Sequence, residues 1–329
     1  INLSTSGSVV SQTGSVLDFS GGSVAYRDGV IATTQLMSQG QVVDIAKADP
    51  NQHYDSIVGS LTLPADKWGV KQSWQIPGLQ SAHSESAYVD GKAGGHLVIQ
   101  AYESALAGTF DGQTISGTRQ RLPALQAAAS SLYFDMTQGN LFGKQNVVFS
   151  QEKANIPSID EAINRQAPNS KQVAPLVLDP ASFKNAGIGR LSIRTNGTVT
   201  LQDGQTLALA DNAQLRIEAA GVDIQGGIVT HGGSVQVQPV QSAGVLAANP
   251  INMGTNASID VSGVWLNDWL SSQQGKPLSG LAAINGGSVS FLTERGDLTL
   301  QTGSHIDASS GAWMKTQGKL VAGTAGAIS

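Results

Sequence analysis

The chain has 329 residues, of which only 13% are charged, and its formal net charge is −5. It contains no cysteine, which excludes disulfides, thiol catalysis and zinc sites built on thiolates. No run of five basic residues occurs, so nucleic acid and anionic membranes are poor partners. No apolar run approaches the ~20 residues that a membrane-spanning helix needs, so membrane insertion is not expected.

The first 49 residues predict short strands joined by Gly and Ser turns. One phrase within them, GSVLDFSG at residues 14–21, returns as NASIDVSG at residues 256–263 and as GSHIDAS at residues 303–309. A recurring strand-and-turn phrase is typical of a chain that stacks one structural unit repeatedly. In each copy we expect the aliphatic residue to point inward and the Asp and Ser side chains to bond turn amides.

Residues 50–91 interrupt the strand pattern with prolines and with Tyr54, Trp68 and Trp74. Their composition predicts an irregular insertion that is held together by aromatic side chains. Short apolar strands between glycines resume after it and continue to about residue 150.

Residues 151–186 predict a second insertion, which is the most helical part of the chain. Ser158 and Glu161 form a capping-box pattern that opens a short helix ending near Arg165. A second helix is predicted to begin at Asp179-Pro180 and to end at Gly187. Helices this short are not stable alone, so we expect them to lie against a β-core.

Residues 188–240 contain the most regular pattern, a series of aliphatic-x-aliphatic triplets that mostly recur every eight residues. Two or three triplets with their turns make a unit of roughly 20 residues, which is within the range of solenoid repeats. The triplets are residues 191–193, 199–201, 207–209, 215–217 and 222–224.

The last block starts at residue 251 and carries a third predicted insertion at 264–280, with Trp265 and Trp269. Repeats resume at residue 286 and reach the C-terminus. Because no polar capping helix follows, we expect the natural chain to continue beyond Ser329.

These patterns predict an all-β fold, a right-handed parallel β-helix that runs as one continuous segment over residues 1–329. Irregular and short helical insertions are expected at approximately 50–91, 151–186 and 264–280. A β-sandwich needs hairpin connections, and it explains neither the repeated phrase nor the eight-residue step.

Three segments give the chain a resemblance to the filamentous haemagglutinin family of large bacterial exoproteins: residues 14–29, 88–95 with 117–121, and 178–235. The resemblance implies a β-helical rod, secreted or on the bacterial surface, that is exported by the two-partner (type Vb) route through an outer-membrane transporter. It also implies a role in adhesion, biofilm cohesion or toxin delivery. The family's secretion-domain motif is approached only at residues 249–252, so the chain resembles an internal segment of a longer exoprotein.

The sequence predicts no catalytic residue, metal site or cofactor, and we do not expect an enzyme. No two histidines have metal-ligand spacing. Asp18, Asp260 and Asp307 occupy the same point of the repeated phrase, so turn capping explains them better than glycoside hydrolysis does. Three Asn-x-Ser/Thr triplets, at Asn2, Asn196 and Asn256, match the N-glycosylation pattern, but such matches are expected by chance in this composition.

Tryptophans carry the strongest functional signal, because four of the five lie in the predicted insertions. Exposed tryptophans can stack on sugar rings or on a partner protein. The alternative, which we favour, is that they form small cores that pin each insertion to the β-helix. The candidate ligand contacts are Trp68, Trp74, Trp265 and Trp269.

Three functions fit this sequence. The first is a structural and adhesive rod segment that contacts polysaccharide or a cell-surface receptor. The second is the stalk of a contact-dependent growth-inhibition toxin, and the third is a β-helical polysaccharide lyase or hydrolase. The third needs two carboxylates that face each other across a groove.

Overall fold

The computed structural model describes residues 1–58, 60–65, 70–75, 82–137, 144–152, 156–158, 173–240 and 249–329. The described chain is mostly β-structure and divides into two compact units. The first unit comprises Ile1–Val24 and Asp90–Ser329, and the second comprises Ala25–Val89.

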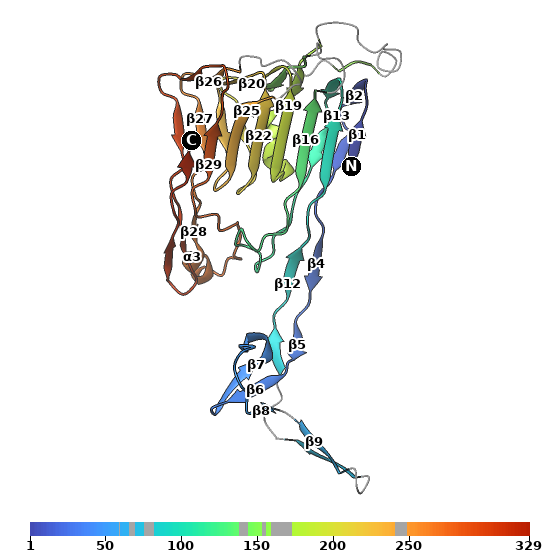
Figure 1. The fold of residues 1–329 in the computed structure, drawn as a ribbon, viewed down its shortest axis with the longest axis vertical. Helices are drawn as coiled ribbons and strands as arrows, with labels where there is room; N and C mark the ends of the chain where they lie inside the picture. The colour runs from blue at the N-terminus through green and yellow to red at the C-terminus, as the bar shows by residue number, and fades with distance from the viewer. Residues whose placement is uncertain are drawn as a thin grey trace. The chain divides into compact units, whose positions relative to one another are not determined.

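Three long parallel sheets make up most of the first unit (Figure 1). The eight-stranded sheet has the order β1 (Asn2–Ser4), β13 (His96–Gln100), β16 (Ser131–Met136), β19 (Arg190–Thr195), β22 (Gln214–Ala219), β25 (Ser234–Pro239), β29 (Ser288–Phe291) and β34 (Ala327–Ile328). The six-stranded sheet has the order β18 (Leu176–Leu178), β17 (Val147–Phe149), β20 (Thr198–Leu201), β23 (Gly221–Ile224), β26 (Ile251–Met253) and β30 (Leu298–Leu300). The four-stranded sheet has the order β21 (Thr206–Ala208), β24 (Gly227–Val229), β27 (Ser258–Asp260) and β31 (His305–Asp307).

From β19 to β27 the chain visits the eight-, six- and four-stranded sheets in turn, three times in succession. The predicted triplets explain this order, because each of them supplies one strand to one sheet. Two further parallel pairs occur near the N-terminus. They are β2 (Ser8–Ser11) with β14 (Glu103–Leu106), and β3 (Val16–Asp18) with β15 (Thr109–Asp111). Long parallel sheets visited in rotation are consistent with a β-helix or another solenoid.

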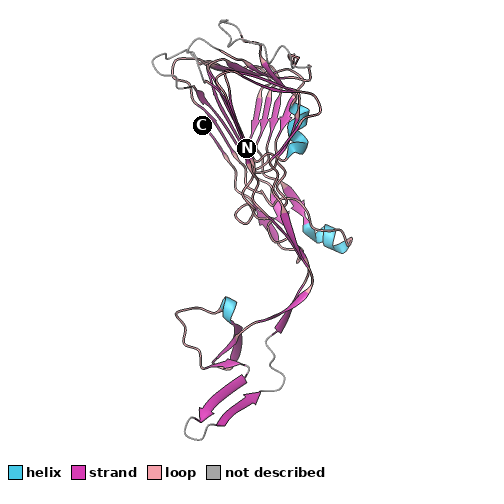
Figure 2. Ribbon diagram, turned by 90° about the vertical axis from the view of Figure 1, so that its right-hand side faces the viewer, coloured by secondary structure: helices cyan, strands magenta, loops and turns pink. Residues whose placement is uncertain are grey.

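The core lies between the sheets, where Figure 2 shows strands on two sides of a shared interior. Inward residues of neighbouring strands stack in register, so each apolar side chain covers the one before it. One such row is Leu97, Leu132, Leu191, Leu215, Val235 and Val289, none of which is more than 1% exposed. Burying a side chain of this size contributes about 1.5–3 kcal/mol to the free energy of folding. Every additional repeat therefore extends the core and adds a similar stabilisation.

The repeated phrase adopts the predicted conformation in all three copies. Ile259 and Ile306 are in register between β27 and β31; Ile259 is fully buried in the core, and Ile306 is half-buried against it. Asp18, Asp260 and Asp307 each accept a hydrogen bond from the backbone N–H two residues later, at 2.8 to 2.9 Å. The prediction that these carboxylates cap turns is therefore confirmed.

Helix α2 (Pro180–Ala186) confirms the helix predicted from Asp179 to Gly187. The Asp179 carboxylate accepts from the Ala181 N–H, and Gly187 ends the helix in the left-handed region, with φ of 62°. Phe183 is fully buried and packs on Phe110 and Phe149, so this helix rests on the β-core as expected. The other predicted helix, from Ser158 to Arg165, lies almost entirely outside the described residues.

The boundaries of the predicted insertions differ from the structure. β18 lies inside the predicted insertion 151–186 but pairs with β17 in the six-stranded sheet. Residues 29–45, which were expected among the repeats, form antiparallel pairs in the second unit rather than parallel rungs. The second unit begins at Ala25, well before residue 50.

The second unit is built from antiparallel strands. Its pairs are β5 (Gly29–Ala32) with β11 (Ala82–Glu85) and β9 (Ser60–Ala65) with β10 (Val70–Gln75); β6 (Gln35–Ser38) lies between β7 (Gln41–Asp44) and β8 (Ser56–Val58). The chain passes between the units within β4 (Ser23–Tyr26) and β12 (Tyr88–Gly91). A single 3₁₀ turn, Ile45–Lys47, follows β7.

Candidate functional site

The third predicted insertion forms an arm at the C-terminal end of the sheets (Figure 1). This tryptophan arm consists of β28 (Trp265–Asn267), α3 (Asp268–Gln273) and the hairpin of β32 (Ala312–Met314) and β33 (Leu320–Ala322). β28 pairs parallel to β32, which pairs antiparallel to β33. The Asn267 side chain caps α3 by accepting from the Leu270 N–H at 2.9 Å.

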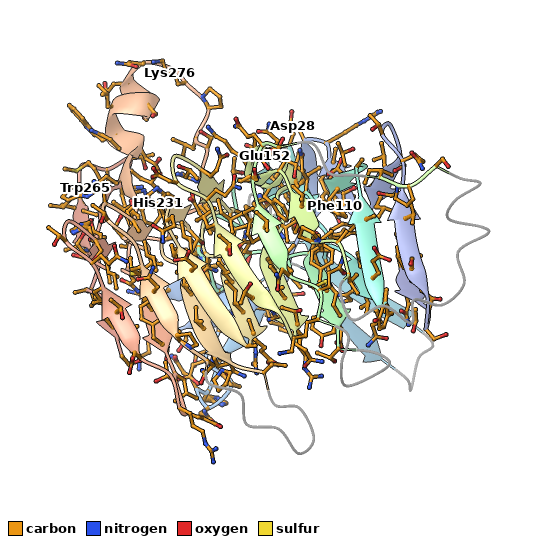
Figure 3. The ribbon with its side chains drawn as sticks, turned by 90° about the horizontal axis from the view of Figure 1, so that it is seen from above. Asp28, Phe110, Glu152, His231, Trp265 and Lys276 are labelled. Carbon is orange, nitrogen blue, oxygen red and sulfur yellow. The ribbon has the colours of Figure 1, made fainter. Side chains whose placement is uncertain are left out.

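Two tryptophans of the arm face solvent. Trp265 is 76% exposed and Trp269 is 45% exposed, and Leu270 beside them is also exposed. Figure 3 shows Trp265 beside the C-terminal strands and Lys276 on the segment that follows α3. Because α3 has only six residues, its position depends on contacts to the rest of the unit rather than on helix propensity.

A buried ion pair holds this arm. Two guanidinium nitrogens of Arg121 donate to the two carboxylate oxygens of Asp268, at 2.6 and 3.0 Å, and the side chains are only 7% and 5% exposed. Arg121 also donates to the carbonyl oxygens of Ser279 and Gly280, at 2.8 and 2.9 Å. The Trp313 indole donates to Asp268 at 2.8 Å, so every strong polar group of the pair is bonded.

The pKa of Asp268 is lowered by this arrangement. Burial by itself would raise it, but hydrogen bonds from Arg121 and Trp313 and the positive charge of Arg121 outweigh burial. Asp268 therefore stays a carboxylate well into the acid range. The ion pair consequently persists under ordinary conditions and fixes the first residue of α3.

A pocket of about 360 Å³ lies beside this ion pair. Trp313 lines it, with the Lys315 ammonium 4.9 Å and the Arg121 guanidinium 5.8 Å from the centre of its ring. Leu122 and Leu125 supply an apolar wall. An aromatic ring flanked by cations and apolar side chains suits a ligand with both apolar faces and polar edges.

The structure places the four predicted contact residues differently. Trp265 and Trp269 lie together on the arm, and the favoured interpretation of them as a small core is wrong for Trp265, which is mostly exposed. Trp313 takes the packed position instead. Trp74 lies in β10 opposite Leu61, where only the backbone is described, and Trp68 lies outside the described residues. Sugar contact by any of them stays a prediction.

Sequence reasoning missed the role of Arg121 and Asp268. The two residues are 147 positions apart, and no local pattern links them. The one available signal is that only 13% of the residues are charged, so the two arginines at positions 119 and 121 stand out in their loop.

Among the described residues, no three His, Asp or Glu side chains gather as a metal site would require. The described helices are all too short or too polar to cross a membrane.

No protein-family model matches the chain. No curated protein and no solved structure matches it either.

Proposed function

We propose that this chain is a right-handed parallel β-helix segment of a secreted or surface-attached bacterial exoprotein, and that it serves in adhesion. The filamentous haemagglutinin-like phrases of its sequence support export by two-partner secretion through an outer-membrane transporter. The observation that carries the proposal is an arm, anchored by a buried ion pair, that presents two exposed tryptophans beside a regular stack of strands.

The exposed indoles and the fixed position of the arm both favour the binding of sugars. An aromatic side chain offers a large contact area, and sugar rings present apolar C–H faces on which an indole can stack. Because Arg121 and Asp268 already fix the arm, binding orders few additional groups, which reduces the entropy cost of association. A rod of stacked repeats supplies the extended scaffold on which such contacts can be displayed.

The test is retention of the whole chain on a panel of immobilised bacterial and host polysaccharides. We expect at least one matrix to retain the protein, and the double variant Trp265→Ala/Trp269→Ala to lose at least tenfold in affinity. The matched control is Leu292→Ala, which removes a 53% exposed apolar side chain from outside the arm. Both variants should melt like the parent, since exposed substitutions change stability by about 0.5 kcal/mol or less.

Three results would contradict this proposal. If the double variant and the parent are retained equally, the tryptophan arm does not contact the polysaccharide. Release of reducing or unsaturated sugar ends in the bound fraction would instead favour the lyase or hydrolase alternative. A toxin domain at the C-terminus of the full-length exoprotein would favour the growth-inhibition stalk.

A further inference from the structure

A hollow of about 400 Å³ lies on the outward face of the eight-stranded sheet, and two more, of about 430 and 460 Å³, lie beside it at the turns that lead into the strands. Arg190 lines the first two, Ser234 lines the last two, and Gln214 lines all three. The hollows are therefore neighbours along β19, β22 and β25, and we name them together the polar groove.

Residues of the polar groove repeat in register from strand to strand. Ser131, Arg190, Gln214 and Ser234 occupy one row across the sheet. Tyr133, Ser192, Arg216 and Gln236 occupy the next row. Neighbouring strands are about 4.8 Å apart, so a ligand lying along the groove meets a hydrogen-bonding side chain at each regular step.

Most charges along this face already have partners. Arg194 lies between Asp135, at 3.7 Å, and Glu218, at 3.3 Å. Arg216 pairs with Glu218 at 2.7 Å, and the Tyr133 hydroxyl donates to Asp135. Burial and the negative charge of Asp135 raise the pKa of Tyr133, so this phenol remains a neutral donor. These bonds pre-organise the floor of the groove.

Arg190 differs from these arginines. Its Nε donates to the Gln214 side-chain oxygen at 3.0 Å, which fixes the plane of the guanidinium. Across the part of the chain that the structure describes, no carboxylate forms an ion pair with it, and its side chain is exposed. The two terminal nitrogens of a fixed guanidinium bind a carboxylate or sulfate through two parallel hydrogen bonds.

We propose that the polar groove binds a linear acidic polysaccharide, with Arg190 holding an acidic group and the amides and hydroxyls around it bonding sugar hydroxyls. This inference rests on the adhesive function proposed above only in taking a glycan as the ligand. Charge complementarity selects the occupant, because Arg190 has no carboxylate partner among the described residues, whereas Arg194 and Arg216, which also line the groove, are paired with Glu218. Nucleic acid fits poorly, because duplex DNA carries about one negative charge per 1.7 Å of helix, and its phosphates would also meet Asp135 and Glu218 on the same face.

The test is calorimetric titration of the whole chain with an oligogalacturonate, which carries one carboxylate per sugar, and with its fully methyl-esterified form. We expect the acidic form to bind at least tenfold more tightly than the ester. Arg190→Ala should remove that difference while leaving binding of the ester unchanged. Arg190→Lys should keep part of it, because a lysine retains the charge but loses the paired donors.

Controls separate this groove from the tryptophan arm. Lys276→Ala removes a cation of the arm and should leave the preference for the acidic form intact. The double variant Trp265→Ala/Trp269→Ala should also leave it intact, so failure of the arm does not imply failure of the groove. Absence of oligogalacturonate binding by the parent, an unchanged preference in Arg190→Ala, or Arg190-dependent binding of duplex DNA would each overturn the proposal.

Discussion

Replacing Asp268 by alanine tests whether the buried ion pair holds the tryptophan arm. The substitution leaves the Arg121 guanidinium only 7% exposed and without its carboxylate, although it keeps its two bonds to backbone carbonyls. It also removes the acceptor of the Trp313 indole.

The expected cost follows from the burial of both partners. Removing one member of a buried ion pair typically costs about 3–5 kcal/mol, because the remaining charge stays desolvated. In a stack of repeats each unit contacts only its neighbours, so the loss should fall on the arm and on the Arg121 segment that anchors it rather than on the whole chain. About 3 kcal/mol corresponds to roughly a 100-fold change in an opening equilibrium.

Hydrogen exchange measures this local opening. In Asp268→Ala, we expect peptides covering residues 264–283 and 312–322 to exchange about 100-fold faster or more. Peptides from β19 and β22 should keep the exchange rates of the parent. The same variant should lose polysaccharide retention if the arm carries the contact.

The matched control is Asp90→Ala, which breaks the Lys92 ion pair, whose side chains are 30% and 51% exposed. Exposed pairs contribute about 0–1 kcal/mol, so this variant should behave like the parent. A double variant, Arg121→Met/Asp268→Leu, should recover much of the lost protection, because it removes both buried charges. A change of less than tenfold in Asp268→Ala would refute the reasoning.

Three more predictions follow from the structure. Because the pKa of Asp268 is lowered, its carboxylate stabilises the arm above the unfolded pKa of about 3.9, and this contribution is lost as pH falls through the folded pKa. The protection of arm amides, relative to intrinsic exchange at each pH, should therefore fall in acid in the parent but not in Asp268→Asn. Gly226→Ala places a Cβ 2.2 Å from the Gln205 carbonyl oxygen and should lower the urea midpoint, whereas Gly22→Ala, with open space around it, should not. Phe183→Ala should cost about 3–5 kcal/mol in urea unfolding, because the removed ring is fully buried.

The individual strands of the parallel sheets were predictable because their signal is local. The triplets at 191–193 and 215–217 alternate apolar and polar residues, and their inward positions pair in register. The Asp-x-Ser phrase likewise predicts its own turn, since the carboxylate bonds the amide two residues later. Local alternation and local turn bonds need no knowledge of the partner strand.

What the sequence could not predict depends on pairing partners. Gln41–Asp44 has the apolar content of a repeat strand, yet it pairs antiparallel with Gln35–Ser38. Alternation reports that a strand has one apolar face, but not which neighbour it joins or in which direction. For the same reason the ion pair between Arg121 and Asp268 was not predicted, because the two residues meet only after the intervening repeats have stacked.

The two proposed sites have a common structural origin. Inward positions of each repeat must be apolar, which leaves the outward rows and the insertions free to carry chemistry. The polar groove uses the rows and the tryptophan arm uses an insertion, and both belong to the first unit. A polymer long enough to reach both would bind the second site at a high effective concentration, so two weak contacts would suffice for strong retention. Short oligosaccharides engage only one site, which is why the calorimetric test uses an oligomer and the retention test uses a polymer.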